Sequence, residues 1–242
     1  MYVVGGTTGY RYTIDVHRFD FRTNTWTELY RKIWGNTENS AFPEERYRHE
    51  IIHHKKKLYI FGGGTADACF GFKEVAIFDL ATKKWEPMVT KMDVETASYP
   101  KPRRCHGCVQ RNNQIYIVGG IDGTEICEDL WRLDLETAQW TKLKEKMPLP
   151  VYFHGTAVSP AGQMFVFGGV NSAPHNQRNN DLYSIWLGKP PLHDLAWQAF
   201  LSYCDVTALN KTSAEDLMMM GIPMQYVRCL HGVDALRPAL PS

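Results

Sequence analysis

The chain has 242 residues, and its 27 lysines and arginines nearly balance 26 aspartates and glutamates, for a net charge of +1. That balance provides no overall attraction to nucleic acid or to an anionic membrane. The six cysteines lack the spacing of a disulfide framework, and no apolar run reaches the roughly 18 residues that span a bilayer. Because no leader-like segment opens the sequence, a reduced cytoplasmic or nuclear compartment is favoured.

A unit of about fifty residues recurs along the chain, which is the period of propeller repeats. Each copy has an apolar run that ends in a Gly-Gly pair, and the four runs occupy residues 1–6, 58–63, 115–120 and 164–169. Such a run is typical of a strand buried on both faces, and glycine permits the backbone turn that follows it.

A second strand follows each of the first three runs, at residues 16–20, 75–79 and 130–134, and each ends in an Asp before a polar turn. A Trp comes directly after the turn and opens a short outer strand. We expect these residues, Trp26, Trp85 and Trp140, to pack between blades. The fourth copy has Ile185-Trp186 at the Asp step and lacks the spaced Trp, which suits a terminal unit.

A further strand precedes each of the later Gly pairs. The lead-in segments to these inner strands are residues 46–49, 103–106 and 151–154, and each ends in a histidine. Four antiparallel strands per unit make one propeller blade. With its Gly pair, its Tyr-Asp-like step and its spaced Trp, the stretch 1–187 resembles the Kelch family of β-propellers.

The Kelch resemblance implies a closed wheel of about six blades, whereas this chain contains four units. Met1 already stands within the first apolar run. We therefore interpret residues 1–187 as part of a longer propeller whose N-terminal blades are missing, with an open edge at the first blade.

The tail changes period after Leu187, where residues 188–191 form a Gly- and Pro-containing break. We expect a helical module over 188–232 and a disordered end over 233–242. One apolar stripe predicts a helix of about fourteen residues; its members are Leu192, Leu195, Ala196, Ala199, Phe200 and Tyr203.

Two more helices are predicted in this tail. Residues 212–215 read as a capping box, Gly221 as a stop and Pro223 as the first turn of the last helix. Three helices this short have no core of their own. We therefore expect them to dock, either over the edge of the last blade or on a partner.

Two segments of the tail resemble adaptor-binding motifs. Residues 191–200 resemble the elongin BC box, with Ala196 where Cys is usual, and residues 222–226 resemble a cullin-2 box. Together with the propeller, they make the chain similar to the Kelch domain-containing substrate receptors. The resemblance implies a non-catalytic subunit of a cullin-2 ubiquitin ligase that binds elongin B and elongin C and recognises the C-terminal ends of client proteins. It implies these adaptor-binding residues: Leu192, Leu195, Ala196, Phe200, Ile222 and Pro223.

The client site is predicted at the lead-in segments, on the loop face of the propeller. Four arginines there have planar guanidinium groups suited to a carboxylate, and aromatic side chains are placed to wall a pocket. The candidates are Arg46, Tyr47, Arg48, Arg103, Arg104, Tyr152 and Phe153. In the alternative interpretation, the arginines form hydrogen bonds inside the blades. We interpret His49, His106 and His154 as scaffold.

Two other function classes were weighed. A Kelch propeller can be an interaction scaffold for actin or for a signalling enzyme such as a phosphatase, and burial of Leu192 and Ala196 against the last blade would favour that function. Copper radical oxidases of this fold need two Tyr, two His and a Cys around a metal, and the sequence shows neither that set nor a nucleophile beside a base. Cys105 and Cys108 have the gap of a zinc knuckle but point to opposite faces of a strand. We predict no catalytic residue, metal or cofactor.

Overall fold

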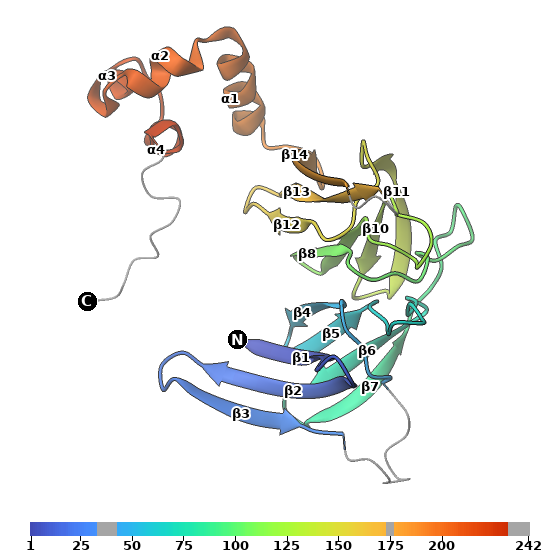
Figure 1. Ribbon diagram of the computed structural model, residues 1–242. Coiled ribbons are helices and arrows are strands. Elements are labelled where there is room, and N and C mark those ends of the chain that lie inside the picture. The colour runs from blue at the N-terminus through green and yellow to red at the C-terminus, as the bar shows by residue number, and fades with distance from the viewer. Residues whose placement is uncertain (33–42, 173–176, 232–242) are drawn as a thin grey trace. The chain divides into compact units, whose positions relative to one another are not determined.

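The computed structural model describes residues 1–32, 43–172 and 177–231. The chain divides into two compact units, Met1–Leu187 and Gly188–Ser242 (Figure 1). Within the described ranges, no helix combines the length and apolar character that crossing a bilayer requires. The predicted disorder of residues 233–242 concerns a segment outside the described residues.

The first unit consists of four antiparallel sheets that follow one another in chain order, which confirms the predicted Kelch-type blades. Blade 1 contains β1 (Tyr2–Thr7), β2 (Tyr12–Asp20) and β3 (Thr25–Tyr30). Blade 2 contains β4 (Glu50–His54), β5 (Lys57–Phe61), β6 (Glu74–Asp79) and β7 (Lys84–Val89). Blade 3 contains β8 (Gly107–Arg111), β9 (Gln114–Val118), β10 (Asp129–Asp134) and β11 (Gln139–Lys146). Blade 4 contains β12 (Gly155–Val158), β13 (Gln163–Ser172) and β14 (Gln177–Trp186).

Blades 2 and 3 have the predicted four strands, and blades 1 and 4 have three strands each among the described residues. Blade 1 lacks the strand that would correspond to β4. Blade 4 lacks the outer strand that would correspond to β7 and β11.

The turn that follows the Asp step explains why blade 4 lacks an outer strand among the described residues. Asp134 ends β10, and its Oδ1 accepts hydrogen bonds from the N–H groups of Glu136 and Thr137, both at 3.0 Å, which fixes the hairpin into β11. In β14 the corresponding residue is Trp186, because it lies opposite Gln163 as Asp134 lies opposite Gln114. Without a carboxylate to organise the turn, the chain leaves the blade.

The Gly pairs let neighbouring blades approach closely. Gly62 has a φ of +57°, and a Cβ at that position would lie 2.7 Å from Cε1 of His106 in blade 3. The next glycine, Gly63, donates its N–H to the carbonyl oxygen of Arg103 at 2.9 Å. A larger residue at Gly62 would push the two blades apart. Glycine is therefore required both because its φ is positive and because His106 lies so close.

Two of the three repeat tryptophans pack between blades as predicted. Trp140 is fully buried, and its Nε1 donates to Oγ1 of Thr90 in blade 2 at 3.2 Å. Trp85 lies with its ring centroid 6.0 Å from that of Tyr30 in blade 1. The prediction is wrong for Trp26, which is 54% exposed and packs on Phe19 of its own blade.

All six cysteines are free thiols. Burial raises the pKa of Cys105 and of Cys127 to about 11, and it raises that of Cys108 well above its ordinary value. Cys229, in the second unit, is exposed. The thiols of the blades are therefore protonated and shielded, while one thiol of the helical unit is open.

The second unit contains four helices rather than three: α1 (Leu192–Tyr203), α2 (Val206–Lys211), α3 (Ala214–Met219) and α4 (Met224–His231). Helix α2 was not predicted. Asp205 caps it by accepting the N–H groups of Thr207 and Ala208. The cap of α3 is Ser213, which accepts the N–H of Asp216, one residue later than the predicted capping box.

The helices also form a small core, contrary to the prediction that they lack one. Leu217, Ile222, Tyr226 and Val227 are its buried members. Helix α1 joins it through Trp197, whose ring stacks on that of Tyr226 with centroids 4.4 Å apart. The core thus joins α3, the α3–α4 turn and α4, and Gly221, at a φ of +86°, allows that turn.

Candidate functional site

The three lead-in segments have four equivalent positions, and each position has a distinct role. The first position is occupied by Arg46, Arg103 and Val151, the second by Tyr47, Arg104 and Tyr152, the third by Arg48, Cys105 and Phe153, and the fourth by His49, His106 and His154.

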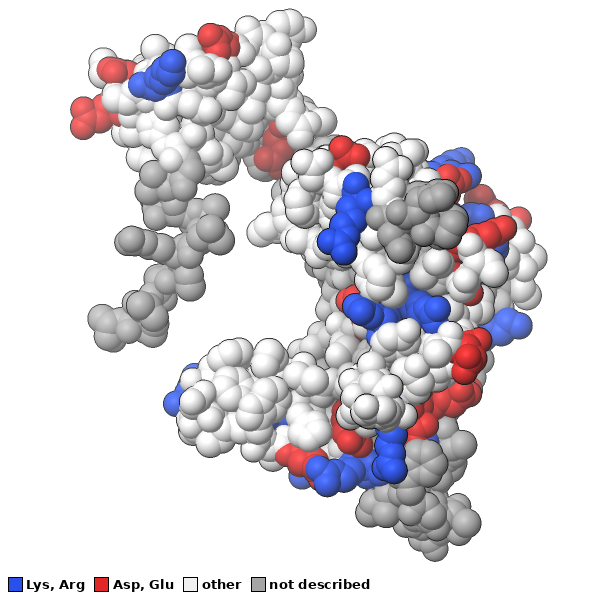
Figure 2. Space-filling view, viewed as in Figure 1, with Lys and Arg blue, Asp and Glu red and all other residues white. Residues whose placement is uncertain are grey.

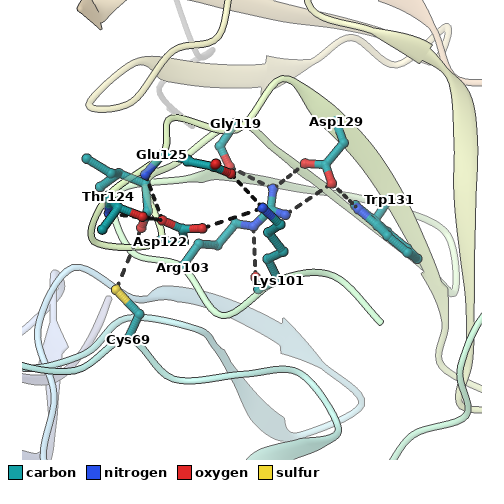
Figure 3. A network of polar contacts seen from close by, with 10 residues as sticks. Cys69, Lys101, Arg103, Gly119, Asp122, Thr124, Glu125, Asp129 and Trp131 are labelled. Atoms are coloured by element: carbon teal, nitrogen blue, oxygen red, sulfur yellow. Dashed lines mark hydrogen bonds and ion pairs between the residues drawn. The ribbon is translucent and has the colours of Figure 1, made fainter. Parts of the chain in front are cut away.

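At the first position, the arginine side chains form polar contacts inside their own blade, as Arg103 does in Figure 3. Arg103 is fully buried, donates to the carbonyl oxygen of Gly119 at 3.0 Å and pairs with Asp129 through Nη1 at 2.6 Å. Burial pushes the pKa of Asp129 upward, but the hydrogen bonds and charge of Arg103 outweigh it and hold that pKa below its usual value. Arg46 likewise donates to the carbonyl oxygen of Gly62 at 3.1 Å.

The expectation that all four guanidinium groups meet at the loop face therefore does not hold for Arg46 and Arg103. Their donors are directed to carbonyls within the blade, and burial lowers the pKa of Arg46 to about 10. The alternative interpretation, in which these arginines form internal hydrogen bonds, describes the two side chains correctly.

The fourth position carries neutral imidazoles, of which His106 is buried and His49 and His154 are partly buried. Burial lowers the pKa of His49 and His154 to about 4, and burial together with the charge of Arg103 lowers that of His106 to about 3. These rings fill the space that the Gly pairs leave between blades, which confirms their interpretation as scaffold.

The second position links each lead-in segment to the loop after a Gly pair. Tyr47, Arg104 and Tyr152 form single antiparallel bridges to Gly64, Ile121 and Val170 respectively. Arg104 also donates to the carbonyl oxygens of Thr65 and Ala66 in blade 2. Its guanidinium group is therefore partly engaged by the neighbouring loop.

The third position has the same unusual backbone conformation in all three segments, with the side chains of Arg48 and Phe153 exposed and that of Cys105 buried. Arg48, Cys105 and Phe153 have φ values of +57°, +56° and +58°, in the left-handed region that non-glycine residues seldom adopt. They are joined across the blades, since Cys105 N–H donates to Arg48 O at 3.0 Å and Phe153 N–H to Cys105 O at 3.1 Å. A backbone held in this way at three successive blades marks a specialised surface.

This backbone brings Arg48 of blade 2 over Phe153 of blade 4, with the guanidinium carbon 4.5 Å from the ring centroid. Both residues line a cavity of about 360 Å³ with Arg178 and Asn179 of β14. Arg48 is exposed, and its contacts within the described residues are with the rings of Tyr47 and Phe153. We call Arg48, Phe153, Arg178 and Asn179 the Arg48 site.

The Arg48 site contains one cation that the sequence did not indicate. Arg178 lies at the start of β14, outside the three lead-in segments, in the part of the fourth unit that departs from the repeat after its Gly pair. The described residues contain no group of three or more His, Cys, Asp or Glu side chains able to hold a metal ion. The chemistry of the site is that of anion binding beside an aromatic wall.

In the second unit, the predicted adaptor residues separate into two groups. Leu192 is 81% exposed, and Leu195, Ala196 and Phe200 are also exposed, whereas Trp197 anchors α1 from another side of the helix. Pro223 is exposed before α4. Ile222 is buried in the core of the unit, so the prediction that it contacts an adaptor is inconsistent with its position.

Charges are distributed differently over the two units. On the face seen in Figure 2, lysines, arginines and acidic residues are interspersed over the first unit, while the second unit shows mostly uncharged residues. Helix α1, which carries the apolar stripe, contains one acidic residue, Asp194, and no lysine or arginine.

Comparison with known proteins agrees with this architecture. The KLHDC2/KLHL20/DRC7 Kelch-repeats domain matches residues 1–191. Kelch domain-containing protein 10 of Homo sapiens is 45% identical over 231 residues, which cover 95% of this chain and 50% of that protein. The Mus musculus protein of the same name is 42% identical and 51% covered. A Drosophila melanogaster Kelch domain-containing protein 10 homolog is 34% identical over 246 residues, with 40% covered.

This chain spans about half the length of the vertebrate relatives that it matches. The family match covers the blades, and the alignment with the Homo sapiens relative, over 95% of the chain, also takes in most of the helical unit. The chain therefore belongs to the KLHDC2/KLHL20/DRC7 Kelch-repeat family.

Proposed function

We propose that this chain is the substrate-recognition part of a cullin-2 ubiquitin ligase, with helix α1 as its contact to elongin B and elongin C. The observation that carries the proposal is the exposed apolar stripe of α1. Every member of that stripe is exposed, and no residue of the helix is buried. A helix that is fixed to its own unit by a side chain outside the stripe leaves the stripe to a partner with a hydrophobic groove.

The client end of the proposal rests on the Arg48 site. Arg48 is exposed, stacks on Phe153 and has Arg178 in the same cavity. A free C-terminal carboxylate suits the planar donors of such arginines, and the aromatic ring suits the last side chain of a peptide. Clients are then selected by their C-terminal residues, and catalysis belongs to other subunits.

The adaptor contact is tested by mixing the full chain with purified elongin B–elongin C complex and measuring co-elution by size-exclusion chromatography. We expect Leu192→Asp to abolish co-elution, because a charge would enter the apolar contact. Gln198→Asp, an exposed substitution on the same helix outside the stripe, is the matched control and should bind normally. Equal recovery of the complex with both variants would remove the ligase proposal and leave the Kelch interaction scaffold for actin or a signalling enzyme.

The client site is tested with peptides that carry either a free or an amidated C-terminus. We expect amidation to weaken binding roughly tenfold or more, since it removes the charge that Arg48 pairs with. Arg48→Gln should weaken binding of the free peptide to the level of the amidated one, while Arg11→Gln, at another exposed arginine, should not. A chain that binds both peptides equally does not recognise the carboxylate.

A further inference from the structure

Blade 2 contains a buried arginine, Arg46, whose acidic partner is missing from the place where blade 3 provides one. In blade 3, Arg103 pairs with Asp129, the first residue of β10 (Figure 3). The counterpart of Asp129 in blade 2 is Glu74, because β6 and β10 are both six residues long and both end in the Asp of the turn. Glu74 is exposed, and within the described residues Arg46 has no carboxylate partner.

The charge of Arg46 is therefore held in an unfavourable environment. The residue is only 8% exposed, and the ring of Phe70 lies over its guanidinium carbon at 4.4 Å from the ring centroid. Nε donates to Glu44 O and Nη1 to Gly62 O, both at 3.1 Å, which leaves the N–H groups of Nη2 available. Burial lowers the pKa of Arg46 to about 10, and the charge of Glu44 offsets this only in part. An anion that reached Nη2 would remove a cost of folding.

A cavity of about 540 Å³ gives access to this guanidinium group. It lies between three segments, residues 44–46, 70–74 and 99–102, and Arg46 is part of its lining. The residues of its aromatic and proline wall are Phe70, Phe72, Tyr99, Pro100 and Pro102. The cavity thus combines one buried cation with a largely carbon-lined wall.

The cavity is a local feature of blade 2, and an insertion contributes to it. Phe70 and Cys127 have matching places, because each donates its N–H at 2.8 Å to the carbonyl oxygen of the second glycine of its pair. Four positions separate Phe70 from the start of β6, whereas two separate Cys127 from the start of β10. The two extra residues are Gly71 and Phe72, and both line the cavity.

The wall suits an aromatic or aliphatic group. Tyr99 donates its hydroxyl to Thr90 O at 3.1 Å, so its ring is the part that is left for the cavity. Lys73 lies over that ring, with Nζ 5.6 Å from the centroid. A carbon body placed against Tyr99 and the two prolines would remove apolar surface from water on both sides.

Size and charge narrow the choice of ligand. The volume lies within the roughly 300–1,000 Å³ of small-molecule sites, and a single Asp or Glu side chain would leave most of it unfilled. The rim carries Glu44 and Glu74 as well as Lys73 and Lys101, and Lys101 is paired with Glu125 at 2.7 Å. Two rim carboxylates disfavour a multiply charged anion such as a phosphate ester, whereas a single carboxylate can be held at Arg46.

We propose that this cavity, which we call the Arg46 cavity, binds a low-molecular-weight carboxylic acid with an aromatic or aliphatic body. The ligand carboxylate accepts hydrogen bonds from Nη2 of Arg46 and supplies the counter-charge that Asp129 supplies in blade 3. The body of the ligand lies against Tyr99, Pro100 and Pro102. The Arg46 cavity shares no lining residue with the Arg48 site, and its ligand does not depend on the ligase function.

The test titrates 5-fluoroindole-3-propionate into the full chain and follows binding by fluorine NMR. We expect a dissociation constant of about 1 mM or lower, from the usual affinity per atom of small ligands. The primary amide of the same molecule has the same shape without the charge, so it should bind roughly tenfold or more weakly. An acid that does not bind, or an acid and an amide that bind equally, would overturn the proposal.

Two variants locate the ligand. Arg46→Lys keeps the charge but removes the planar fork, so it should weaken binding of the acid roughly tenfold. Gly71→Leu should abolish binding, because it places a side chain between Gly71 and Pro102 inside the cavity. A Cβ at Gly71 would meet only Cγ of Pro102, at 3.5 Å, and the φ of this glycine is not in the left-handed region, so the fold should tolerate the change.

The matched control is Gly155→Leu in β12, where an added Cβ meets nothing within 4 Å; this variant should bind the acid normally. Circular dichroism confirms that each variant is folded. Unchanged binding by Gly71→Leu would overturn the proposal. So would loss of binding with Arg48→Gln alone, which would place the acid in the Arg48 site. Tighter binding of the blocked peptide acetyl-Ala-Phe-Glu-Phe-Ala-amide would also overturn it, because the cavity would then belong to a polypeptide side chain.

Discussion

Arg103 and Arg48 show how two arginines in equivalent segments take opposite roles. Arg103 is fully buried and saturates carbonyl and carboxylate acceptors inside blade 3. Arg48 is two positions later in its lead-in segment, at a left-handed backbone position, and its side chain is exposed. In an extended strand, positions two apart face the same way. The positive φ at Arg48 breaks that rule and separates scaffold from surface.

Replacement of Arg103 should therefore affect stability. We expect Arg103→Met to lower the free energy of unfolding by roughly 3–5 kcal/mol, because it leaves the Asp129 carboxylate in the blade without its partner. Arg46→Met is the comparison. Within the described residues, Arg46 has carbonyl acceptors but no carboxylate partner, so the loss should be smaller. Urea denaturation measures both, and equal losses would show that the Asp129 pair is not the cause.

At the scale of elements, the outer strands are held by their tryptophans. We expect Trp140→Ala to lower the free energy of unfolding by roughly 3–5 kcal/mol, since the ring is fully buried and its N–H bonds across to blade 2. Trp26→Ala should lower it by much less, because Trp26 is 54% exposed. Thermal or urea unfolding of the two variants decides between this account and one in which every repeat tryptophan contributes alike.

The strands were predictable from sequence because their signals repeat: the Gly pair, the Asp turn and the Trp recur in register. Helix α2 was not, because its six residues carry no apolar stripe, and its one local signal is the cap at Asp205. The site was only partly predictable. Arg46 and Arg48 cannot be told apart by residue type, and the backbone conformation that separates them depends on hydrogen bonds between blades.

At the scale of the whole molecule, the histidines of the lead-in segments make the stability of the blades depend on pH. Their folded pKa values, about 4 for His49 and His154 and about 3 for His106, lie below the unfolded value of 6.5. Folding therefore favours the neutral rings, and their contribution to stability is complete above about pH 6.5 and is lost as pH falls toward 4. Glu50 acts in the opposite sense, because burial raises its pKa from 4.5 to about 7.

Between pH 6 and 5, the unfolded chain binds protons at three histidines, while the folded chain keeps one on Glu50. The net difference favours the unfolded state. We expect the free energy of unfolding to fall by on the order of 2 kcal/mol per pH unit in that window. The urea midpoint measured from pH 7.5 to 5 gives the slope. A midpoint that stays constant, or rises on acidification, would contradict this balance of groups.

The distribution of thiols allows the opening of the blades to be followed by chemical labelling. Cys105, Cys108 and Cys127 are protected by burial in the blades, whereas Cys229 in α4 is exposed. A maleimide reagent added in excess would modify Cys229 at once and the blade cysteines only when the sheets separate. Mass spectrometry of the labelled protein over time would thus give the rate at which the blades open, without any engineered probe.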